Sequence, residues 1–282
     1  MVKSSAHMGK RLGSFFQTSV FFFVFLGFFS CQKELDPEAY QTCLPQTIEV
    51  YLNGNANPGE LYTYVYDPAT LWPQSITLSI PDSLYLKTIN VSFANDTIYL
   101  GAVGFIKLDG SRRITQLSLN EDLAGVEKGN YFYGYNNEGV LAERLFDNGD
   151  DVLERAAFTH QGTYIDSFYF QYEFQPGTLL GSLSYLSSPN GNGENNLLPY
   201  TDIFPELLPF AYMVKLGSIS NDLPDKMKVL YESPGMPTYT LNYAYSSYGF
   251  NSDNLLTGFG SQLTVEGYPD YHRRFSIAYV CQ

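Results

Sequence analysis

Residues 131–141 read Tyr-Phe-Tyr-Gly-Tyr-Asn-Asn-Glu-Gly-Val-Leu, and this stretch decides the fold class. Its tyrosines occupy alternate positions, which point to one face of an extended strand. The Asn-Asn-Glu-Gly segment supplies residues that tolerate the dihedral angles of a turn, and apolar residues resume after it. A strand, a tight turn and a second strand form a β-hairpin.

The same alternation recurs at residues 62–66, 168–174 and 239–245, with a looser copy at 105–114. Together these five runs hold 16 of the chain's 45 tyrosine and phenylalanine residues. Turn-forming residues and then aliphatic residues follow these runs. We therefore predict an all-β chain of consecutive antiparallel hairpins, arranged as a meander, an open sheet or a sandwich.

Residues 202–214 depart from the strand pattern and predict one short helical insertion. Asp202 is placed to cap this helix, and Pro205 and Pro209 limit it to a turn or two. Its apolar residues are nearly continuous, which favours a buried plug or cover over a surface helix. A loop that touches a membrane is the alternative.

The N-terminus carries the pattern of a bacterial export signal. Basic residues within the first eleven positions precede an apolar run over 20–29, and Ser30 stands before Cys31. This arrangement resembles the lipobox of bacterial lipoproteins. The resemblance implies cleavage before Cys31, acylation of that residue and a folded domain tethered to a membrane. An ordinary secretory signal and an uncleaved anchor are the alternatives.

Residues 32–36, Gln-Lys-Glu-Leu-Asp, resemble the lysine-plus-acid signals of surface-exposed Bacteroidota lipoproteins. A solvated linker is the plainer interpretation. We expect a signal peptide over 1–30, a lipidated N-terminus and linker over 31–45, and a single β-rich domain over 46–282. The expected location is the outer membrane, with the domain facing the periplasm or the cell exterior.

The repeated unit consists of Tyr-x-Tyr, a polar turn ending in Gly, one residue and then Leu. It resembles the tyrosine-rich hairpins of YD-type repeats and a family of Bacteroidota lipoproteins of unknown function. The likeness covers roughly residues 60–282 and implies hairpin architecture without implying an activity. In that lipoprotein family an apolar insertion often precedes a Leu-Pro pair, which is here Leu223 and Pro224.

The charge of the mature chain excludes one class of partner. Removal of residues 1–30 leaves 13 basic against 29 acidic groups, a net charge of −16. Recognition of phosphate backbones depends on Lys and Arg contacts, so this charge argues against a nucleic-acid partner.

Cysteine usage points to one disulfide. With Cys31 assigned to lipid, Cys43 and Cys281 remain, and an even remainder in an exported chain indicates a disulfide between them. Two free thiols are the alternative. The spacing offers no Cys-x-x-Cys pair for redox catalysis.

The histidines give little support to catalysis or to zinc binding. Only His160 and His272 follow the signal region, and neither accompanies a Gly-x-Ser-x-Gly or His-Glu-x-x-His motif. We expect His160 in a loop and His272 beside a strand, each as a surface or structural residue.

One acidic turn is a calcium candidate. Asp147, Asn148, Asp150 and Asp151 place several oxygen ligands on a sharp turn, and Glu154 follows within reach. The spacing is not that of an EF-hand, and the same residues are ordinary in hairpin turns.

The sequence therefore favours a non-catalytic envelope lipoprotein with a binding or structural role and no required cofactor. Its expected partners are the membrane, through the lipid, and a glycan, a peptide or another envelope protein. The alternative is a hydrolase that acts on polysaccharide through paired carboxylates, whose separation in space the sequence does not reveal.

Overall fold

The computed structural model describes residues 43–149, 152–162, 164–172, 178–186, 197–216, 223–232, 235 and 237–281. Cys43–Val280 form one compact unit, and Met1–Thr42 with Cys281–Gln282 are assigned to another. The export signal and Cys31 lie outside the described residues, and the predicted division into signal, linker and domain stays a prediction. None of the described helices has the length and hydropathy needed to cross a bilayer.

The described chain is all-β, as the alternation predicted, with short 3-10 helices. The strands are β1 (Cys43–Leu52), β2 (Glu60–Tyr66), β3 (Pro73–Ile80), β4 (Tyr85–Asn90), β5 (Ser92–Ala94), β6 (Thr97–Tyr99), β7 (Gly104–Leu108), β8 (Ile114–Leu119), β9 (Gly129–Tyr135), β10 (Leu141–Asp147), β11 (Val152–Gln161), β12 (Tyr164–Tyr172), β13 (Thr178–Tyr185), β14 (Pro224–Glu232), β15 (Tyr239–Phe250), β16 (Leu256–Val265) and β17 (Tyr271–Cys281). The 3-10 helices are η1 (Pro81–Ser83), η2 (Leu198–Asp202) and η3 (Pro205–Phe210).

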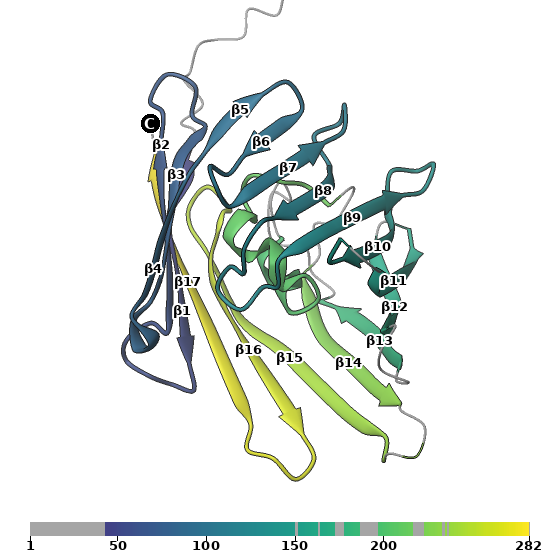
Figure 1. The fold of residues 1–282 in the computed structure, drawn as a ribbon. Coiled ribbons are helices and arrows are strands. Elements are labelled where there is room, and N and C mark those ends of the chain that lie inside the picture. Colours follow the sequence, from purple (N-terminus) through teal and green to yellow (C-terminus); the bar gives the residue numbers. More distant parts are fainter. Residues whose placement is uncertain are drawn as a thin grey trace, which may run out of the picture. The chain divides into compact units, whose positions relative to one another are not determined.

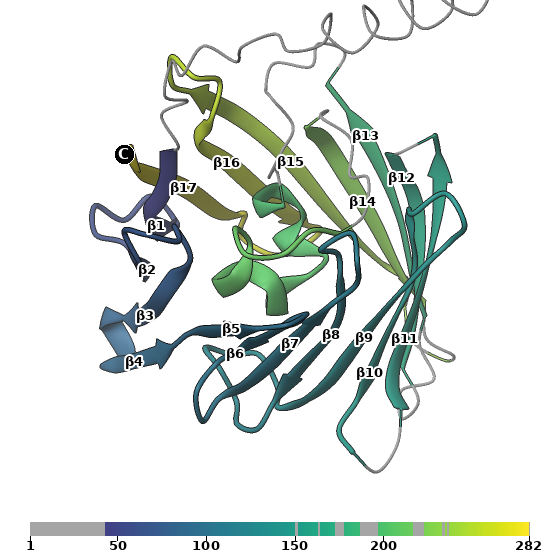
Figure 2. The same ribbon diagram turned by 90° about the horizontal axis from the view of Figure 1, so that it is seen from above.

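The strands form one 17-stranded antiparallel sheet that follows chain order. Ladders join successive neighbours from β5 to β17. β17 then pairs with β1, and the ladders continue through β2 and β3 to β4. The result is a nearly closed, barrel-like meander (Figures 1 and 2). The predicted hairpin meander is confirmed, and its near closure was not predicted.

The turn at residues 136–139 has a specific hydrogen-bond pattern. The side-chain Oδ1 of Asn136 accepts from the backbone N–H groups of Glu138 and Val140, each at 3.0 Å. Gly139 takes a φ of 79°, which glycine adopts without steric cost. Asp109 makes the same two contacts, with the N–H groups of Ser111 and Arg113, at 2.8 and 2.9 Å. An Asn or Asp at the first turn position therefore explains why these hairpins share a sequence pattern.

Side chains alternate between the two faces of the sheet. On β14, Met227 and Val229 are buried, whereas Lys226 and Lys228 are exposed. On β11, Arg155 is exposed and the next residue, Ala156, is buried. The inner face is thus apolar and aromatic, whereas the outer face carries charged and polar side chains together with exposed apolar ones such as Val65, Phe132 and Leu180.

Residues 197–216, which we call the plug, lie within the ring of strands (Figure 2). Leu198, Tyr200, Phe204, Leu207 and Phe210 are each at most 1% exposed. The insertion is therefore buried, as its continuous apolar composition predicted. It is helical as two 3-10 turns, whose length the prolines restrict.

The expected cap was wrong. Asp202 ends η2, and Phe204, the residue before η3, makes no side-chain cap hydrogen bond. The Asp202 carboxylate instead binds Arg273 of β17. The effect of a helix N-terminus on a carboxylate is modest and confined to the first turn, whereas removal of the cation from a buried ion pair is strongly destabilising.

Candidate functional site

A cavity of about 370 Å³ lies between the plug and the inner face of the sheet. Its walls come from the loop before β9, from strands β9 to β15 and from the plug. The lining residues are Gly125, Val126, Glu127, Tyr131, Arg144, Phe146, Leu153, Glu154, Phe168, Phe170, Tyr172, Leu179, Asp202, Ile203, Pro205, Glu206, Met227, Val229, Leu241 and Tyr243. This volume lies at the lower end of the range for small-molecule sites, roughly 300–1,000 Å³.

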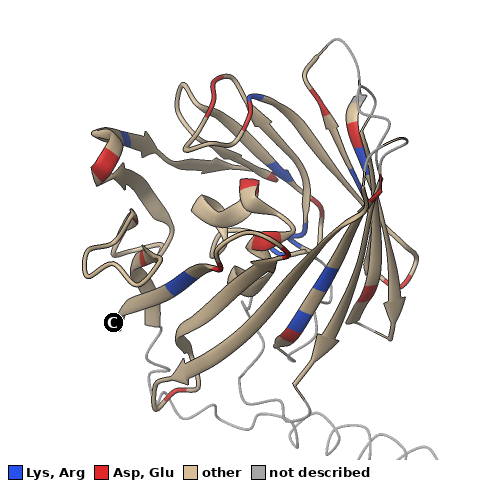
Figure 3. Cartoon of the chain, turned by 90° about the horizontal axis from the view of Figure 1, so that it is seen from below, with Lys and Arg blue, Asp and Glu red and all other residues tan. Residues whose placement is uncertain are grey.

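Arg144 is the central polar residue of the cavity. It shares the inner face of β10 with Phe146 and is only 5% exposed. Its Nη1 donates to both carboxylate oxygens of Glu206 in the plug, at 2.9 and 3.1 Å. The hydroxyl of Tyr133 donates to the same carboxylate at 2.8 Å. Figure 3 shows acidic positions on the helical turns that the strands surround.

Arg144 also forms an ion pair with Glu154 of β11. Its guanidinium lies 5.2 Å from the ring centre of Phe170 and 6.0 Å from those of Tyr131 and Phe204. Cations are attracted to aromatic faces, so the rings stabilise a charge that would otherwise be costly to bury. The Arg144 guanidinium is therefore held by two carboxylates and three rings.

A second ion pair joins the plug to the sheet. Nη1 of Arg273 on β17 donates to Oδ1 of Asp202 at 2.6 Å. Burial raises the pKa of Asp202, and the charge of Arg273 and a hydrogen bond from Tyr245 oppose that rise. Each of the two plug carboxylates thus has an arginine partner on the inner face of the sheet.

Six aromatic side chains line part of the remaining wall, beside aliphatic ones. Burial raises the pKa of Tyr243 to about 12, with the nearby Asp202 carboxylate adding to the rise. Burial likewise raises the pKa of Tyr172, which lies directly opposite Glu154 in the β11–β12 ladder. Phe168 lies over Gly181 of β13, where any Cβ would overlap its ring. Gly181 therefore provides the space that this wall residue occupies.

The arrangement does not support carboxylate-based hydrolysis. Glu154 and Glu206 both line the cavity, and both bind Arg144. Glycosidases need one carboxylic acid that donates a proton and one carboxylate that acts as nucleophile or base. Because both carboxylates bind the same guanidinium, neither is left free to take one of these two roles.

The calcium candidate is only partly described. Oδ1 of Asp147 accepts the backbone N–H of Gly149 at 2.6 Å, the pattern of an ordinary turn. Asp150 and Asp151 lie outside the described residues, and Asn148 is exposed. Glu154 was expected within reach of this turn, but it faces the interior and binds Arg144.

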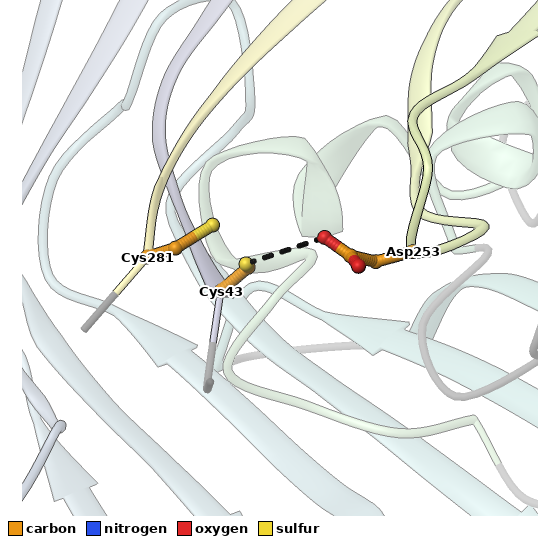
Figure 4. A group of neighbouring side chains, drawn as sticks. All are labelled: Cys43, Asp253 and Cys281. Carbon is orange, nitrogen blue, oxygen red and sulfur yellow. Dashed lines mark hydrogen bonds between the residues drawn. The ribbon is translucent and has the colours of Figure 1, made fainter. Parts of the chain in front are cut away.

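Cys43 and Cys281 are both disulfide-bonded. Figure 4 draws them with Asp253, whose Oδ2 lies 3.8 Å from Sγ of Cys43. A disulfide sulfur has no proton to donate and no thiolate charge to offer a metal. These three residues, although close together, are therefore not interpreted as a metal site.

The two histidines lie in strands. His160 was expected in a loop, but it belongs to β11, and burial lowers its pKa. His272 is exposed on β17, as expected for a residue beside strand residues, and its backbone N–H donates to Oδ1 of Asn53 at 3.1 Å. Neither lines the cavity.

Comparison with known proteins finds similar structures but no sequence relatives. No protein-family model matches the chain, and no curated protein matches it. A porin-like protein from Bacteroides uniformis is similar in structure, with a TM-score of 0.56, 18% identity and coverage of 84% of this chain and 98% of that chain. A porin-like protein from Bacteroides vulgatus has a TM-score of 0.51 and 13% identity over the same shares. At these identities the likeness shows the fold alone.

The sequence interpretation missed the charged residues of the cavity. Arg144 and Glu206 were not candidates for a site, and Glu154 was considered only as a neighbour of the calcium turn, although one signal was present. Arg144 stands two residues before Phe146, so strand periodicity places it on the aromatic face. A charge on a face that is otherwise buried is seldom found unless it is paired.

Proposed function

We propose that this chain is a non-catalytic envelope lipoprotein that binds a small ligand in the cavity beside the plug. The observation that carries the proposal is the cavity itself, with its aromatic and aliphatic walls around a few fixed polar groups. Such a composition is typical of small-molecule sites. A glycan and a peptide side chain are the ligand classes considered, and another envelope protein is the alternative partner.

The tether is proposed from the export signal and Cys31. Charged residues on the outer face support it, since Lys226, Lys228 and Arg155 are exposed there. Charged side chains are solvated by water and are costly to place in the hydrocarbon of a bilayer. A lipid on Cys31 would keep the sheet near a membrane while its outer face stays in water.

The contacts of the plug with the strands argue against a pore through this chain. The plug is buried within the strands and bonded to them on several sides. The Tyr64 hydroxyl of β2 donates to the carbonyl oxygen of Pro209 at 3.1 Å, and the hydroxyls of Tyr212 and Tyr279 lie 3.2 Å apart. Binding beside a fixed plug fits these contacts better than passage through the sheet.

Binding of residues 32–282 to glycan and peptide arrays tests the proposal. Leu179→Trp should fill the cavity and abolish binding, because Leu179 lines it from β13. Leu180→Trp is the matched control, since this neighbour is 39% exposed on the outer face and should leave binding unchanged. Equal binding by both variants, or silence of the parent chain on every array, would contradict a ligand site in the cavity.

A further inference from the structure

We infer that the cavity beside the plug selects a small organic cation with an apolar body, such as an alkylammonium group, over neutral and anionic ligands. The inference rests on the proposed function and names the chemistry of its ligand. Three features support it: the net negative charge of the cavity, the pairing of Arg144 with two carboxylates, and the aromatic rings in the cavity wall.

The charges around the cavity sum to a negative value. Four carboxylates line it, from Glu127, Glu154, Asp202 and Glu206, and Arg144 is the only cation among its described lining residues. Counting Arg273 as the partner of Asp202, the formal charges sum to −2. The sum stays negative when Asp202 holds a proton.

The undescribed segments between residues 43 and 281 contain no basic residue that could change this balance. Between residues 43 and 281 every Lys and Arg belongs to the described residues. Undescribed side chains in that range therefore add no lysine or arginine to the cavity. An anion would meet uncompensated negative charge, and like charges at close range repel strongly where water is scarce.

Arg144 is not free to bind an anion. It contacts Glu154 and Glu206, and its guanidinium lies within 6.0 Å of three ring centres. Capture of an anionic ligand would require Arg144 to release one of these carboxylates. The ligand would then leave a buried carboxylate without its partner, which is costly.

The walls suit an ammonium group. Glu154 lies opposite Tyr172 in the β11–β12 ladder, so a carboxylate and an aromatic ring adjoin on the inner face. A cation gains from both, through a charge-assisted interaction with the carboxylate and through attraction to the ring. Met227, Val229 and Leu241 provide an apolar wall for the body of the ligand. A neutral sugar would use the rings but not the excess charge.

Calorimetry with n-hexylammonium, n-hexanol and n-hexanoate tests the inference, because these probes share one apolar body and differ in charge. Residues 32–282 should bind the ammonium at least about tenfold more tightly than the alcohol, and the carboxylate least. Glu154→Gln should weaken ammonium binding at least about fivefold. Glu143→Gln is the matched control, since Glu143 is exposed on the outer face of β10.

A second variant keeps the inference testable if Glu154→Gln fails to fold. Tyr172→Leu should reduce binding of the ammonium and leave that of the alcohol nearly unchanged, because only the cation uses the ring face. Equal affinity for the alcohol or the carboxylate, or no ammonium binding, would overturn the inference. The proposed function would still stand if an array ligand bound the parent chain and the Leu180→Trp variant but not Leu179→Trp.

Discussion

Replacement of Arg144 by methionine should destabilise the fold strongly, because it leaves the carboxylates of Glu206 and Glu154 without their cation. Glu206 is only 2% exposed. Removal of one partner of a buried ion pair costs about 3–5 kcal/mol. For a chain of this size each kcal/mol lowers the melting temperature by roughly 2–4 °C, so Arg144→Met should lower it by roughly 6–20 °C.

A double-mutant cycle in urea separates this charge effect from lost packing. Glu206→Gln alone should cost less than Arg144→Met, because Arg144 keeps Glu154 as a partner. The double variant should be more stable than the sum of the two single effects, by about 0.5–3 kcal/mol of interaction energy. The second change removes a charge that the first one left unpaired.

Arg155→Met is the control for the loss of a positive charge. Arg155 is exposed on the outer face of β11, so its replacement should change stability by no more than about 0.5 kcal/mol. The reasoning about the plug would be refuted if Arg144→Met and Arg155→Met had equal effects. Additivity of the cycle within about 0.3 kcal/mol would refute it as well.

Three further outcomes follow. Cys31→Ser should abolish membrane fractionation and palmitate labelling, and continued labelling would refute the lipoprotein assignment. Peptide mapping without reductant should recover Cys43 joined to Cys281, and reduction should cost about 5–6 kcal/mol of stability in the chain-entropy model; two alkylatable thiols in fresh protein would contradict the pairing. Burial raises the pKa of Tyr243 to about 12 and that of Tyr133 well above 10. The folded state thus holds protons that the unfolded state releases near pH 10, so stability should be intact below that pH and fall as the pH rises through 12. Full tyrosinate absorbance near pH 10 in folded protein would contradict this order.

The hairpins could be predicted from the sequence because their causes are local. Alternation of tyrosines around residues 131–135 sets the faces of a strand, and Asn136 and Gly139 supply the turn contacts within five residues. Near closure of the sheet depends on pairing between β1 and β17, which are separated by most of the chain. Local alternation is the same in an open sheet, a sandwich or a ring, so it does not distinguish them.

The burial of the plug could be predicted from the sequence, but the residues to which it binds could not. Its continuous apolar residues predicted an enclosed segment, whereas the role of Asp202 was assigned by its position before a helix. Its actual partner, Arg273, is 71 residues away. The same separation hides the cavity, because Arg144 and Glu206 lie 62 residues apart and meet only when the ring of strands forms. Periodicity marks Arg144 as unusual, yet it does not reveal the carboxylates that neutralise it.

The most direct measurement is NMR of residues 32–282 labelled with ¹³C at the methionine methyl groups, during titration with n-hexylammonium. Met227 lines the cavity, whereas Met213 is buried in the plug away from the lining. A ligand in the cavity should shift the Met227 signal saturably and leave that of Met213 nearly in place. An unchanged Met227 signal at saturating probe, or equal shifts of both signals, would contradict a ligand site beside the plug.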